Sequence, residues 1–385
     1  MGSELLGVRY AEMYTGRKFV LSFAKRLLCV IASILVLCLL FVVGYVAYLQ
    51  ITYYRIEDNL VLEVENNQTQ TVATGNEYSV ATYNVGFGAY SPNFSFFCDV
   101  GNLNGKATTG THGTALSKED VENNTEGALT VLKDQDADFL LVQEVDTGST
   151  RNYGVDQLSS FKEDFQGYSS VYAVNSHTAF FIYPFTDMYG SANSGLLTLS
   201  RFRADGALRR SYPISSSFLQ QFVDLDRCFS VTRYPVEDGH ELVIVNSHMS
   251  AYDDGNSSKT KQMEMLNELL EEEAKAGNYV IVGGDWNQSF VSYTTYETQE
   301  TYDEQILFED SSFAEGYHIV YPENVDEVAT CRNADIPYEL GVSLRLCIDG
   351  FVVSDNIDAE SVAIDTEFKY SDHNPVKMNF VLRAQ

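Results

Sequence analysis

An uninterrupted apolar segment constrains this chain more than any other feature of its sequence. Residues 27–49, LLCVIASILVLCLLFVVGYVAYL, form a run of 23 residues without a charged side chain. A bilayer core of about 30 Å requires roughly 20 apolar helical residues, so this run is long enough to cross it. A cleavable signal peptide would have a shorter apolar region, of about 7–15 residues, ahead of a small-residue cleavage site. We therefore expect an uncleaved transmembrane helix over 27–49.

The charges on either side of the apolar run predict its orientation. Five basic residues precede it, against two acidic ones, whereas most of the 54 Asp+Glu residues that give the chain a net charge of -29 follow it. Basic flanks stay on the cytoplasmic side of a membrane. Residues 1–26 are therefore expected to be a cytoplasmic tail. The acidic remainder is expected to lie outside a cell membrane that the chain crosses once.

Beyond the apolar run, the chain contains a short polar segment and one large domain. Residues 50–76 include the polar run ENNQTQT and are expected to be a stalk, and residues 77–385 are long enough for a single domain. With 45% hydrophobic residues the chain can bury a substantial core, and its net acidity excludes a basic nucleic-acid-binding platform. Four cysteines outside the membrane allow disulfides with three possible connectivities: Cys98, Cys228, Cys331 and Cys347.

Apolar strand-like runs recur along the large domain. Several are nearly continuous in Val, Ile and Leu, which is typical of strands buried on both faces. Two helices are expected, over 117–132 and 259–276, because the first opens with a capping Ser117 and the second stops at Gly277. Strands covered by helices imply a layered α/β sandwich. The expected strands are 79–84, 137–143, 170–174, 179–183, 195–200, 229–234, 241–247, 279–283, 346–353 and 376–382.

Polar side chains stand at the ends of several of these strands. Taken singly, each has an ordinary explanation, because Asn and Asp cap turns and a lone His is more often structural than catalytic. As a set they indicate a site, since the ends of neighbouring strands are where metal ligands and proton-transfer groups converge. The residues are Asn84, Glu144, Asn246, His248, Asp285, Asn287, Asp349, Asp372 and His373.

The order of these residues resembles a known family. The motifs are Tyr-Asn84, Gln-Glu144-Val, Asn-Ser-His248, Gly-Asp285-Trp-Asn287, Ile-Asp349 and Ser-Asp372-His373-Asn-Pro, within residues 79–382. This pattern resembles the endonuclease/exonuclease/phosphatase superfamily, which includes deoxyribonuclease-I-like nucleases, neutral sphingomyelinases and inositol-polyphosphate 5-phosphatases. The chain looks like a membrane-anchored, bacterial-type member. The resemblance implies a deoxyribonuclease-I-like α/β fold, in which two central β-sheets are flanked by helices.

The resemblance also implies a metal site. The family uses Mg²⁺, or Mn²⁺ or Ca²⁺, to hydrolyse phosphate esters, and a hard cation of this kind suits a site with few protein oxygens. Glu144 would be the principal ligand, helped by Asn84 and Asp372. A phosphodiester is itself negative and repels hydroxide, and a strongly acidic shell would worsen that repulsion. A bound cation is therefore expected from the net charge as well.

The catalytic roles follow from the resemblance in the same way. Asp285 would activate or orient the attacking water, and Asn287 would hold a non-bridging phosphate oxygen. His373 would bind and polarise the scissile phosphate, oriented by Asp349, because a carboxylate on one ring nitrogen fixes the tautomer and raises the pKa of the imidazole. His248 would donate a proton to the leaving oxygen, or stabilise it.

Two arginines and one insertion are candidates for further substrate contacts. Arg151 follows Glu144 closely, and Arg201 follows the strand expected over 195–200. Residues 85–116 form an aromatic-rich insertion between the first two motifs. Such a loop could grip a base, a sugar or a lipid, or it could simply cover the edge of a sheet.

We therefore expect a membrane-tethered, extracytoplasmic, divalent-metal-dependent phosphoesterase that hydrolyses phosphodiester or phosphomonoester bonds by in-line attack of water. The substrate class stays open among nucleic acid, phospholipid and sugar phosphate, and no obligate protein partner is evident. The alternative is a catalytically silent, tethered binding module on the same scaffold. A two-metal calcineurin-like phosphoesterase is excluded, because no acid follows Asp285 until Glu297.

Overall fold

The structure, a computed structural model, describes residues 2–214, 226–251, 258–302 and 307–384. The chain forms two units, Met1–Tyr54 and Arg55–Gln385, and we call the second the C-terminal unit. The first unit is the helix α1 (Gly2–Thr52), which contains the run expected to cross a membrane. Its segment Leu21–Thr52 is long and apolar enough for a membrane span, and its most apolar window is not buried in the protein.

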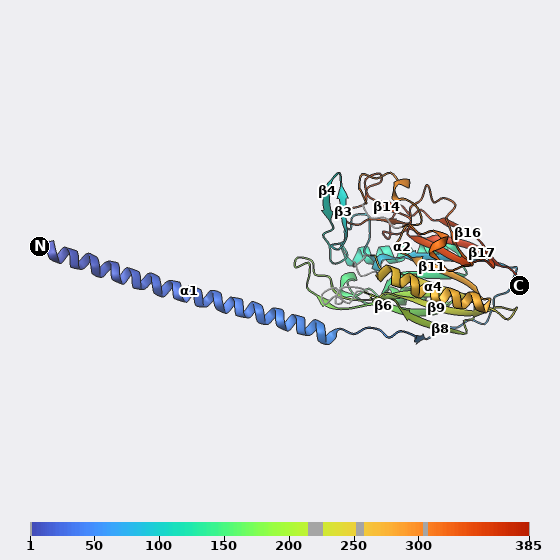
Figure 1. The fold of residues 1–385 in the computed structure, drawn as a ribbon, viewed down its shortest axis with the longest axis horizontal. Coiled ribbons are helices and arrows are strands. Elements are labelled where there is room, and N and C mark those ends of the chain that lie inside the picture. The colour runs from blue at the N-terminus through green and yellow to red at the C-terminus, as the bar shows by residue number, and fades with distance from the viewer. Residues whose placement is uncertain (1, 215–225, 252–257, 303–306, 385) are drawn as a thin grey trace. The chain divides into compact units, whose positions relative to one another are not determined.

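The C-terminal unit is built on two mixed β-sheets with helices on their outer faces (Figure 1). The seven-stranded sheet has the order β1 (Leu60–Leu62), β8 (Gly206–Ser211), β9 (Cys228–Pro235), β10 (Glu241–His248), β11 (Tyr279–Asp285), β15 (Asp349–Ser354) and β12 (Tyr317–Val320). The six-stranded sheet has the order β16 (Ile357–Ala363), β17 (Val376–Leu382), β2 (Glu77–Asn84), β5 (Phe139–Asp146), β7 (Gly190–Ser200) and β6 (Ser169–Phe181). The expected α/β sandwich is confirmed.

Three α-helices and two short antiparallel strand pairs complete the part of the C-terminal unit that the structure describes. The helices are α2 (Lys118–Gln135), α3 (Gln157–Asp164) and α4 (Ser258–Ala276), and the strand pairs are β3 (Val100–Leu103) with β4 (Lys106–Thr109) and β13 (Cys331–Arg332) with β14 (Arg345–Leu346). The expected caps form: the Ser117 side chain accepts a hydrogen bond from the backbone N–H of Asp120, and α4 ends one residue before Gly277.

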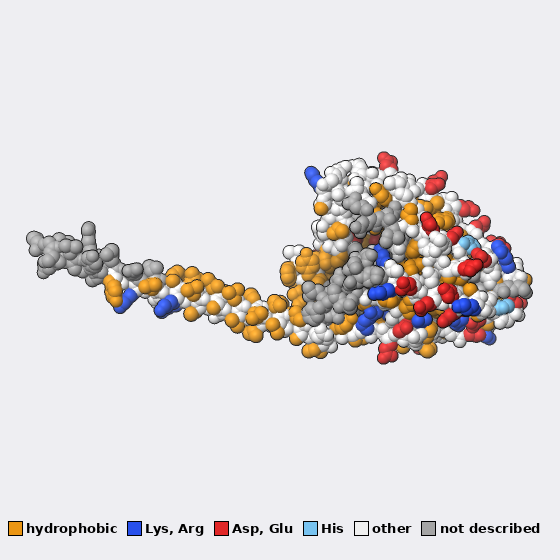
Figure 2. Space-filling model, viewed as in Figure 1, with side chains coloured by type: hydrophobic (Ala, Val, Ile, Leu, Met, Phe, Trp, Pro, Cys, Tyr) orange, Lys and Arg blue, Asp and Glu red, His pale blue; other side chains and the backbone are white. Residues whose placement is uncertain are grey.

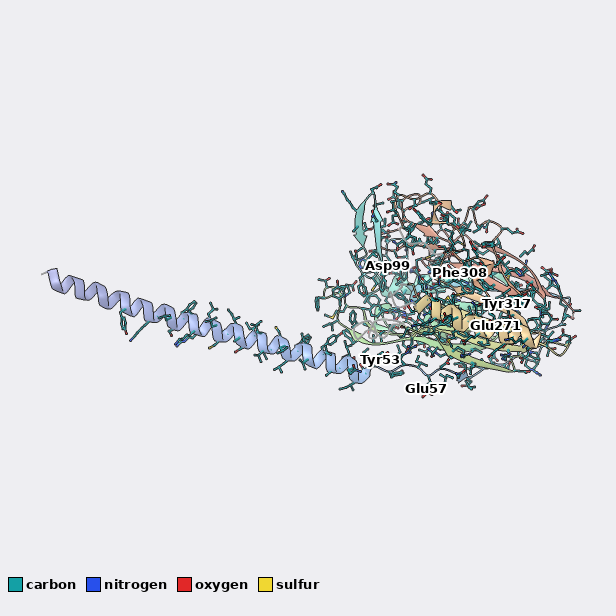
Figure 3. The ribbon with its side chains drawn as sticks, in the orientation of Figure 1. Tyr53, Glu57, Asp99, Glu271, Phe308 and Tyr317 are labelled. Carbon is teal, nitrogen blue, oxygen red and sulfur yellow. The ribbon has the colours of Figure 1, made fainter. Side chains whose placement is uncertain are left out.

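The core lies in three layers because most strands are apolar on both faces. Between the sheets, Val80 and Leu141 of one sheet pack with Ile244 and Ile281 of the other. Outside the six-stranded sheet, α2 and α3 cover a second apolar cluster. Outside the seven-stranded sheet, α4 covers a third, which includes Trp286. Phe308, labelled in Figure 3, lies against that tryptophan with ring centroids 5.6 Å apart.

Each sheet has one parallel pair of strands at its centre, and these pairs place the strand ends that matter. Strands β2 and β5 are parallel, with Asn84 beside Gln143 at their carboxyl ends. Strands β10 and β11 are parallel, with His248 beside Asp285. Close approach of the second pair requires a glycine, since a Cβ on Gly284 would lie 1.9 Å from the carbonyl oxygen of Ser247.

The segment expected to be a stalk is different in the structure. Residues Leu60–Leu62 form β1, which pairs antiparallel with β8, and Arg55 Nε donates to Asp226 Oδ1 at 2.9 Å. The apolar triplet Leu-Val-Leu and the arginine therefore attach this segment to the C-terminal unit, so it is not a free stalk. The polar run ENNQTQT suggested a solvated stalk, but its asparagines bond the backbone of the C-terminal unit. Asn67 Nδ2, for example, donates to the carbonyl of Ala204 at 2.8 Å.

The aromatic insertion is mostly a packed element of the C-terminal unit. Phe87, Tyr90 and Phe94 are buried together with Val121 of α2. These three rings are therefore part of the packed core and not an exposed surface. The disulfides that the sequence allows do not form among the described residues, where Cys228, Cys331 and Cys347 are buried free thiols.

Candidate active site

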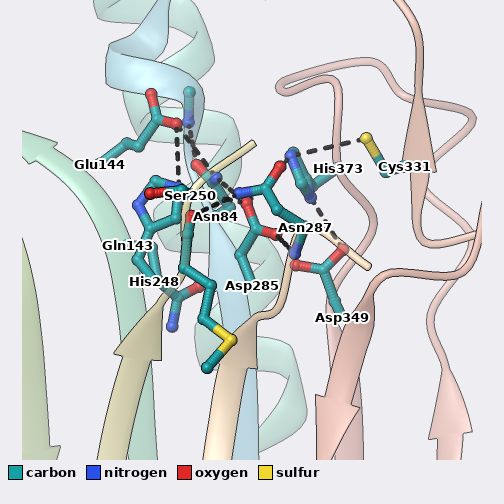
Figure 4. Close-up of polar contacts among 12 residues, drawn as sticks. Asn84, Gln143, Glu144, His248, Ser250, Asp285, Asn287, Cys331, Asp349 and His373 are labelled. Atoms are coloured by element: carbon teal, nitrogen blue, oxygen red, sulfur yellow. Dashed lines mark hydrogen bonds and ion pairs between the residues drawn. The ribbon is translucent and has the colours of Figure 1, made fainter. Parts of the chain in front are cut away.

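The strand-end residues meet at one edge of the sandwich (Figure 4). Asn84 of β2 is the bridge between the sheets: its Nδ2 donates to Glu144 Oε1 at 3.2 Å and to Asp285 Oδ2 at 3.0 Å. Asp349 lies opposite Asp285 in the antiparallel register of β15 with β11. Residues more than two hundred positions apart therefore form one cluster, which is the arrangement expected from the sequence.

Glu144 owes its position to a backbone irregularity. The register of β5 against β7 shifts between Val142 and Val145, and Glu144 has a φ of 56°, in the left-handed region that a glutamate rarely adopts. Without that bulge, strict alternation would put Gln143 and Glu144 on opposite faces of the sheet. Gln143 points between the sheets and donates to Asn246 Oδ1 at 2.8 Å, while Glu144 reaches Asn84 at the edge.

The carboxylates at this edge differ in their exposure. Glu144 keeps 21% of its side chain exposed and Asp372 is half-buried, whereas Asp285 and Asp349 are buried. Burial raises the pKa of the Glu144 carboxyl; the charge of Arg151 opposes this shift and the charge of Asp372 adds to it. Burial also raises the pKa of Asp372, against the opposing charges of His373 and Arg332. The site therefore concentrates carboxylate charge that a cation would stabilise.

We tested whether the residues present fit a divalent ion. Asn84, Glu144 and Asp372 offer amide and carboxylate oxygens, the ligands that hard cations prefer, and two of the three are partly open to solvent. Beyond the effect of burial, the charge of Asp372 raises the pKa of Glu144, and the charge of Asp285 raises the pKa of Asp372. A second group, Asp285, Asp349 and His373, also has ligand atoms within 4.8 Å of one another. The first set fits a hard cation better, because the pKa of His373 is raised and a protonated imidazole cannot be a metal ligand.

His373 is held by Asp349. The Nδ1 of His373 lies 2.8 Å from Asp349 Oδ2, and its Nε2 lies 3.7 Å from Asp285 Oδ2. Burial alone would lower the pKa of His373, but the nearby negative charges, Asp349 foremost, outweigh it and raise that pKa well above the ordinary value. Burial raises the pKa of Asp349, opposed by the charge of His373. The pair thus holds a proton near neutral pH, and His373 presents it as a cation.

His248 lies on the other side of Asp285 in a different environment. Its Nε2 is 3.4 Å from Asp285 Oδ2 and contacts Nη1 of Arg227, a residue that sequence reasoning did not select. Burial lowers the pKa of His248, and the positive charge of Arg227 lowers it further. The Asn175 amide faces His248 Nδ1 at 3.3 Å. Because a guanidinium only donates, Nε2 must accept from Arg227, and the proton of the neutral imidazole then lies on Nδ1. That proton has an acceptor once the Asn175 amide presents its oxygen to the ring, an orientation that also gives a partner to Asn175 Oδ1, which is buried without one among the described residues.

The remaining predicted residues divide between the site and other places. Asn287 lies at the site, where its backbone N–H donates to Asp285 Oδ1 at 2.9 Å and its side chain donates to the carbonyl of Met249. Arg151 lies near Glu144, but its guanidinium is occupied: Nε and Nη2 donate to Asp146, and Nη1 donates to Tyr189. Only 4% of Arg151 is exposed, so it supports the site from behind.

The structure does not bring Arg201 to the cluster. Its backbone N–H donates to the carbonyl of Asp138, which precedes β5, whereas Glu144 lies near the other end of that strand. Its guanidinium pairs with Asp136 and Asp138. Arg201 therefore belongs to the opposite edge of the sandwich. The position right after a strand was not enough to place it, because antiparallel strands end at both edges of a sheet.

Two residues of the cluster had no distinct signal in the sequence. Arg227 was one arginine in an acidic chain, and its place at the site follows from its contact with His248 and from the pairing of Cys228 with His248 across β9 and β10. Cys331 was considered for disulfides, but its Sγ lies 3.6 Å from His373 Nε2. The dipeptide Asp226-Arg227 immediately before a strand was the available clue for the arginine.

The fold and the cluster define a class of protein: an α/β sandwich whose strand ends carry the residues of a phosphoesterase site. The family model described as the Endonuclease/Exonuclease/phosphatase family matches residues 81–373, which is more than half of the chain. The chain belongs to this family. Its members are hydrolases of phosphoester bonds and are typically dependent on a divalent metal.

Solved structures support the same fold. An endonuclease/exonuclease/phosphatase from Beutenbergia cavernae is 15% identical, with a TM-score of 0.54 over 80% of this chain and 72% of that one. Truncated Caenorhabditis elegans TDP2 is 14% identical, with a TM-score of 0.50 over 80% of this chain and 99% of that one. Among curated proteins, no sequence matches this chain.

Proposed function

We propose that this protein is a membrane-tethered, divalent-metal-dependent phosphoesterase that acts outside the cytoplasm by in-line attack of water. The observation that carries the proposal is the meeting of Asn84, Glu144, Asp285, His248 and the His373–Asp349 pair at one edge. A silent binding module would have no need for a buried, carboxylate-paired imidazolium beside a second, neutral imidazole.

The metal would be held by Glu144, Asn84 and Asp372. When bound, a divalent ion supplies positive charge that offsets the developing charge on the phosphoryl oxygens. Mg²⁺ suits these ligands best, because it keeps several waters and needs few protein oxygens. Asn84 also donates to Asp285, so it couples the metal ligands to the residue proposed for proton transfer.

Asp285 is the group we assign to the attacking water. Its Oδ1 accepts the backbone N–H of Asn287 and its Oδ2 accepts from Asn84, so the carboxylate is fixed in orientation and keeps lone pairs for a water. Its Oδ2 also faces both imidazoles, at 3.4 and 3.7 Å. Asn287 is anchored through its backbone N–H to Asp285 and through one side-chain N–H to the Met249 carbonyl, and its second side-chain N–H would contact a non-bridging oxygen.

Two cationic groups flank Asp285 and would hold the phosphate. Protonated His373 is oriented by Asp349 and would donate to a phosphoryl oxygen. On the other side, His248 is neutral and accepts from Arg227, so it has no proton on Nε2 to give. We therefore assign stabilisation of the leaving oxygen to the Arg227–His248 pair, with the guanidinium as the permanent charge. Of the two roles expected for His248, donating a proton to the leaving oxygen or stabilising it, this proposal takes the second.

The tether follows from α1. Its apolar segment Leu21–Thr52 is long enough to span a bilayer, and the basic residues before it favour a cytoplasmic N-terminus. The C-terminal unit, which carries nearly all of the acidic residues, would then lie on the outer side of the cell membrane. The substrate is a phosphate ester.

The test is turnover of an ester panel by the full chain in detergent: plasmid DNA, RNA, sphingomyelin, phosphatidylinositol phosphates and bis-p-nitrophenyl phosphate. We expect cleavage that requires Mg²⁺ or Mn²⁺ and is lost with chelator and in Glu144→Gln. A matched control is Glu237→Gln, an exposed carboxylate in the β9–β10 turn at the opposite edge. No metal-dependent cleavage of any ester between pH 5 and 9 would favour the silent module instead.

A further inference from the structure

The chain joins the C-terminal unit at the edge that carries the active site. Arg55, the first residue of this unit, donates through Nε to Asp226 Oδ1 at 2.9 Å and through Nη2 to the carbonyl of Tyr212. Asp226 precedes Arg227, which contacts His248. The helix α1 ends at Thr52, so only two residues lie between its last residue and Arg55, and the three steps along the chain span at most about 10 Å. A membrane crossed by α1 is therefore close to the active-site edge.

A long hairpin extends past the same edge. Strand β6 contacts the site at Asn175, which faces His248. It continues for six further residues to Phe181 and returns as β7 from Gly190, so at about 3.3 Å per residue it projects roughly 20 Å beyond the site. Because β6 runs in the same direction as β5, this projection is on the side where Glu144 lies.

The tip of this hairpin is apolar, aromatic and exposed. Residues 180–190, FFIYPFTDMYG, contain one charged side chain, in a chain with 54 acidic and 25 basic residues. Tyr183 is 51% exposed, Phe185 71% and Met188 41%. In Figure 2, hydrophobic side chains gather at the end of the C-terminal unit where this hairpin projects in Figure 1, while acidic side chains lie over the opposite half of that face.

The tip is also held in place by the protein. The carboxylate of Asp187, its one charged group, accepts from the backbone N–H of Gly113 at 3.0 Å and from Thr114 Oγ1 at 2.6 Å. The ring of Tyr183 packs against Phe97 and Phe185, with centroids 5.7 and 5.9 Å apart. A firmly anchored tip that keeps aromatic and thioether side chains in solvent needs a partner surface, since exposed apolar patches of this kind mark interaction sites.

We propose that this edge faces the bilayer, with the β6–β7 tip embedded in the lipid interface, and that the site hydrolyses phosphoesters of membrane lipid headgroups. The occupant is a bilayer and not a second protein, because the covalent tether holds the edge close to the membrane and aromatic side chains favour the lipid–water interface. The single charge of the tip, on Asp187, is hydrogen-bonded within the protein, so the tip presents little charge to a negatively charged membrane surface that would repel an acidic protein. The inference rests on the proposed function for its chemistry and on the tether for its geometry.

Insertion is measured first, because it does not depend on activity. The chain has one tryptophan, Trp286, which is fully buried. Phe185→Trp in the full chain, reconstituted into vesicles of phosphatidylcholine with brominated acyl chains, adds a reporter at the tip. We expect its fluorescence, after subtraction of the parent protein, to be quenched at least twofold. The matched control is Glu237→Trp in the turn before β10, about 23 Å along that strand from His248, and it should not be quenched.

Substrate class is measured second, in the same vesicles. We expect Phe185→Ser to lower turnover of vesicle-borne sphingomyelin or phosphatidylinositol phosphates, relative to bis-p-nitrophenyl phosphate, about tenfold, and Glu237→Ser to leave this ratio unchanged. Equal quenching at both tryptophan positions would overturn the inference, as would plasmid DNA cleavage that is equally fast in vesicles and in micelles. Quenching at the tip without turnover of any ester would instead overturn the proposed function.

Discussion

The two sides of Asp285 hold buried histidines with opposite proton affinities. His373 and His248 lie at similar distances from the same oxygen, Asp285 Oδ2, at 3.7 and 3.4 Å. The pKa of His373 is raised because Asp349 lies on its Nδ1, and the pKa of His248 is lowered by burial and by Arg227. Burial is the same on both sides, so the neighbouring charge decides the protonation state. The site therefore has one proton-bearing side and one side with a permanent guanidinium charge.

Asp285 is shared by both sides, so its replacement has the largest expected effect. Asp285→Asn keeps the size of the side chain but removes the base, and we expect the turnover number to fall about 10³-fold or more. The measurement is steady-state hydrolysis of bis-p-nitrophenyl phosphate with Mg²⁺, alongside thermal unfolding to confirm that the variant is folded. A variant that keeps a tenth of the activity would show that Asp285 does not activate the water.

Replacing Arg227 tests the guanidinium side. Arg227→Gln should lower kcat/KM about 10²-fold, because it removes a donor aimed at the leaving oxygen, and should raise the pKa of His248 by removing an adjacent positive charge. The pH dependence of kcat/KM measures both. Arg227→Lys, which keeps the positive charge but lacks the several N–H donors of the guanidinium, should keep part of the rate that Arg227→Gln loses. If kcat/KM falls equally in Arg227→Gln and Arg227→Lys, the positive charge of Arg227 alone does not stabilise the leaving oxygen.

Replacing Asp349 tests the proton-bearing side. Asp349→Asn should lower the pKa of His373 toward or below its ordinary value of 6.5 and lower kcat/KM roughly 10- to 100-fold. If protonated His373 binds the phosphate, kcat/KM falls as the pH rises through the pKa of His373. A lower pKa in the variant should therefore move the alkaline limb of the pH profile of kcat/KM to lower pH. An NMR titration of the histidine ring protons measures the same shift independently. An unchanged alkaline limb would mean that the loss of activity at high pH does not come from deprotonation of His373.

Arg201 gives the smallest expected effect and serves as the reference for Arg227. Its ion pairs with Asp136 and Asp138 are on the surface of the opposite edge. Arg201→Ala should therefore change the free energy of unfolding by at most about 1 kcal/mol and leave kcat/KM for bis-p-nitrophenyl phosphate unchanged. Urea unfolding and the ester assay measure the two quantities. A drop in kcat/KM comparable to that of Arg227→Gln would mean that the effect of Arg227 does not depend on its position beside His248.

Most of the fold was predictable because its elements have strong local patterns. The central strands β2, β5, β10, β11 and β17 are apolar runs with polar ends, and α2 and α4 have amphipathic faces with recognisable caps. The weaker elements were missed, among them β1, β8 and β16, which lie at or near the sheet edges. Strand β1 has only three residues, and β8 and β16 carry charged or polar residues. Edge strands are paired on one side only, so their sequences are less constrained.

The sequence by itself determined the apolar helix, the layered sandwich and the identity of the strand-end residues, because each depends on a short pattern of hydrophobicity or on residue type. Only the tertiary structure decided how Glu144 turns toward Asn84, which arginine reaches His248, and that Arg55 joins the unit beside the site. These features depend on a bulge, on register between strands and on contacts across 150 or more positions. None of them is recorded in the residues of one segment, because each is fixed by how distant segments pack together.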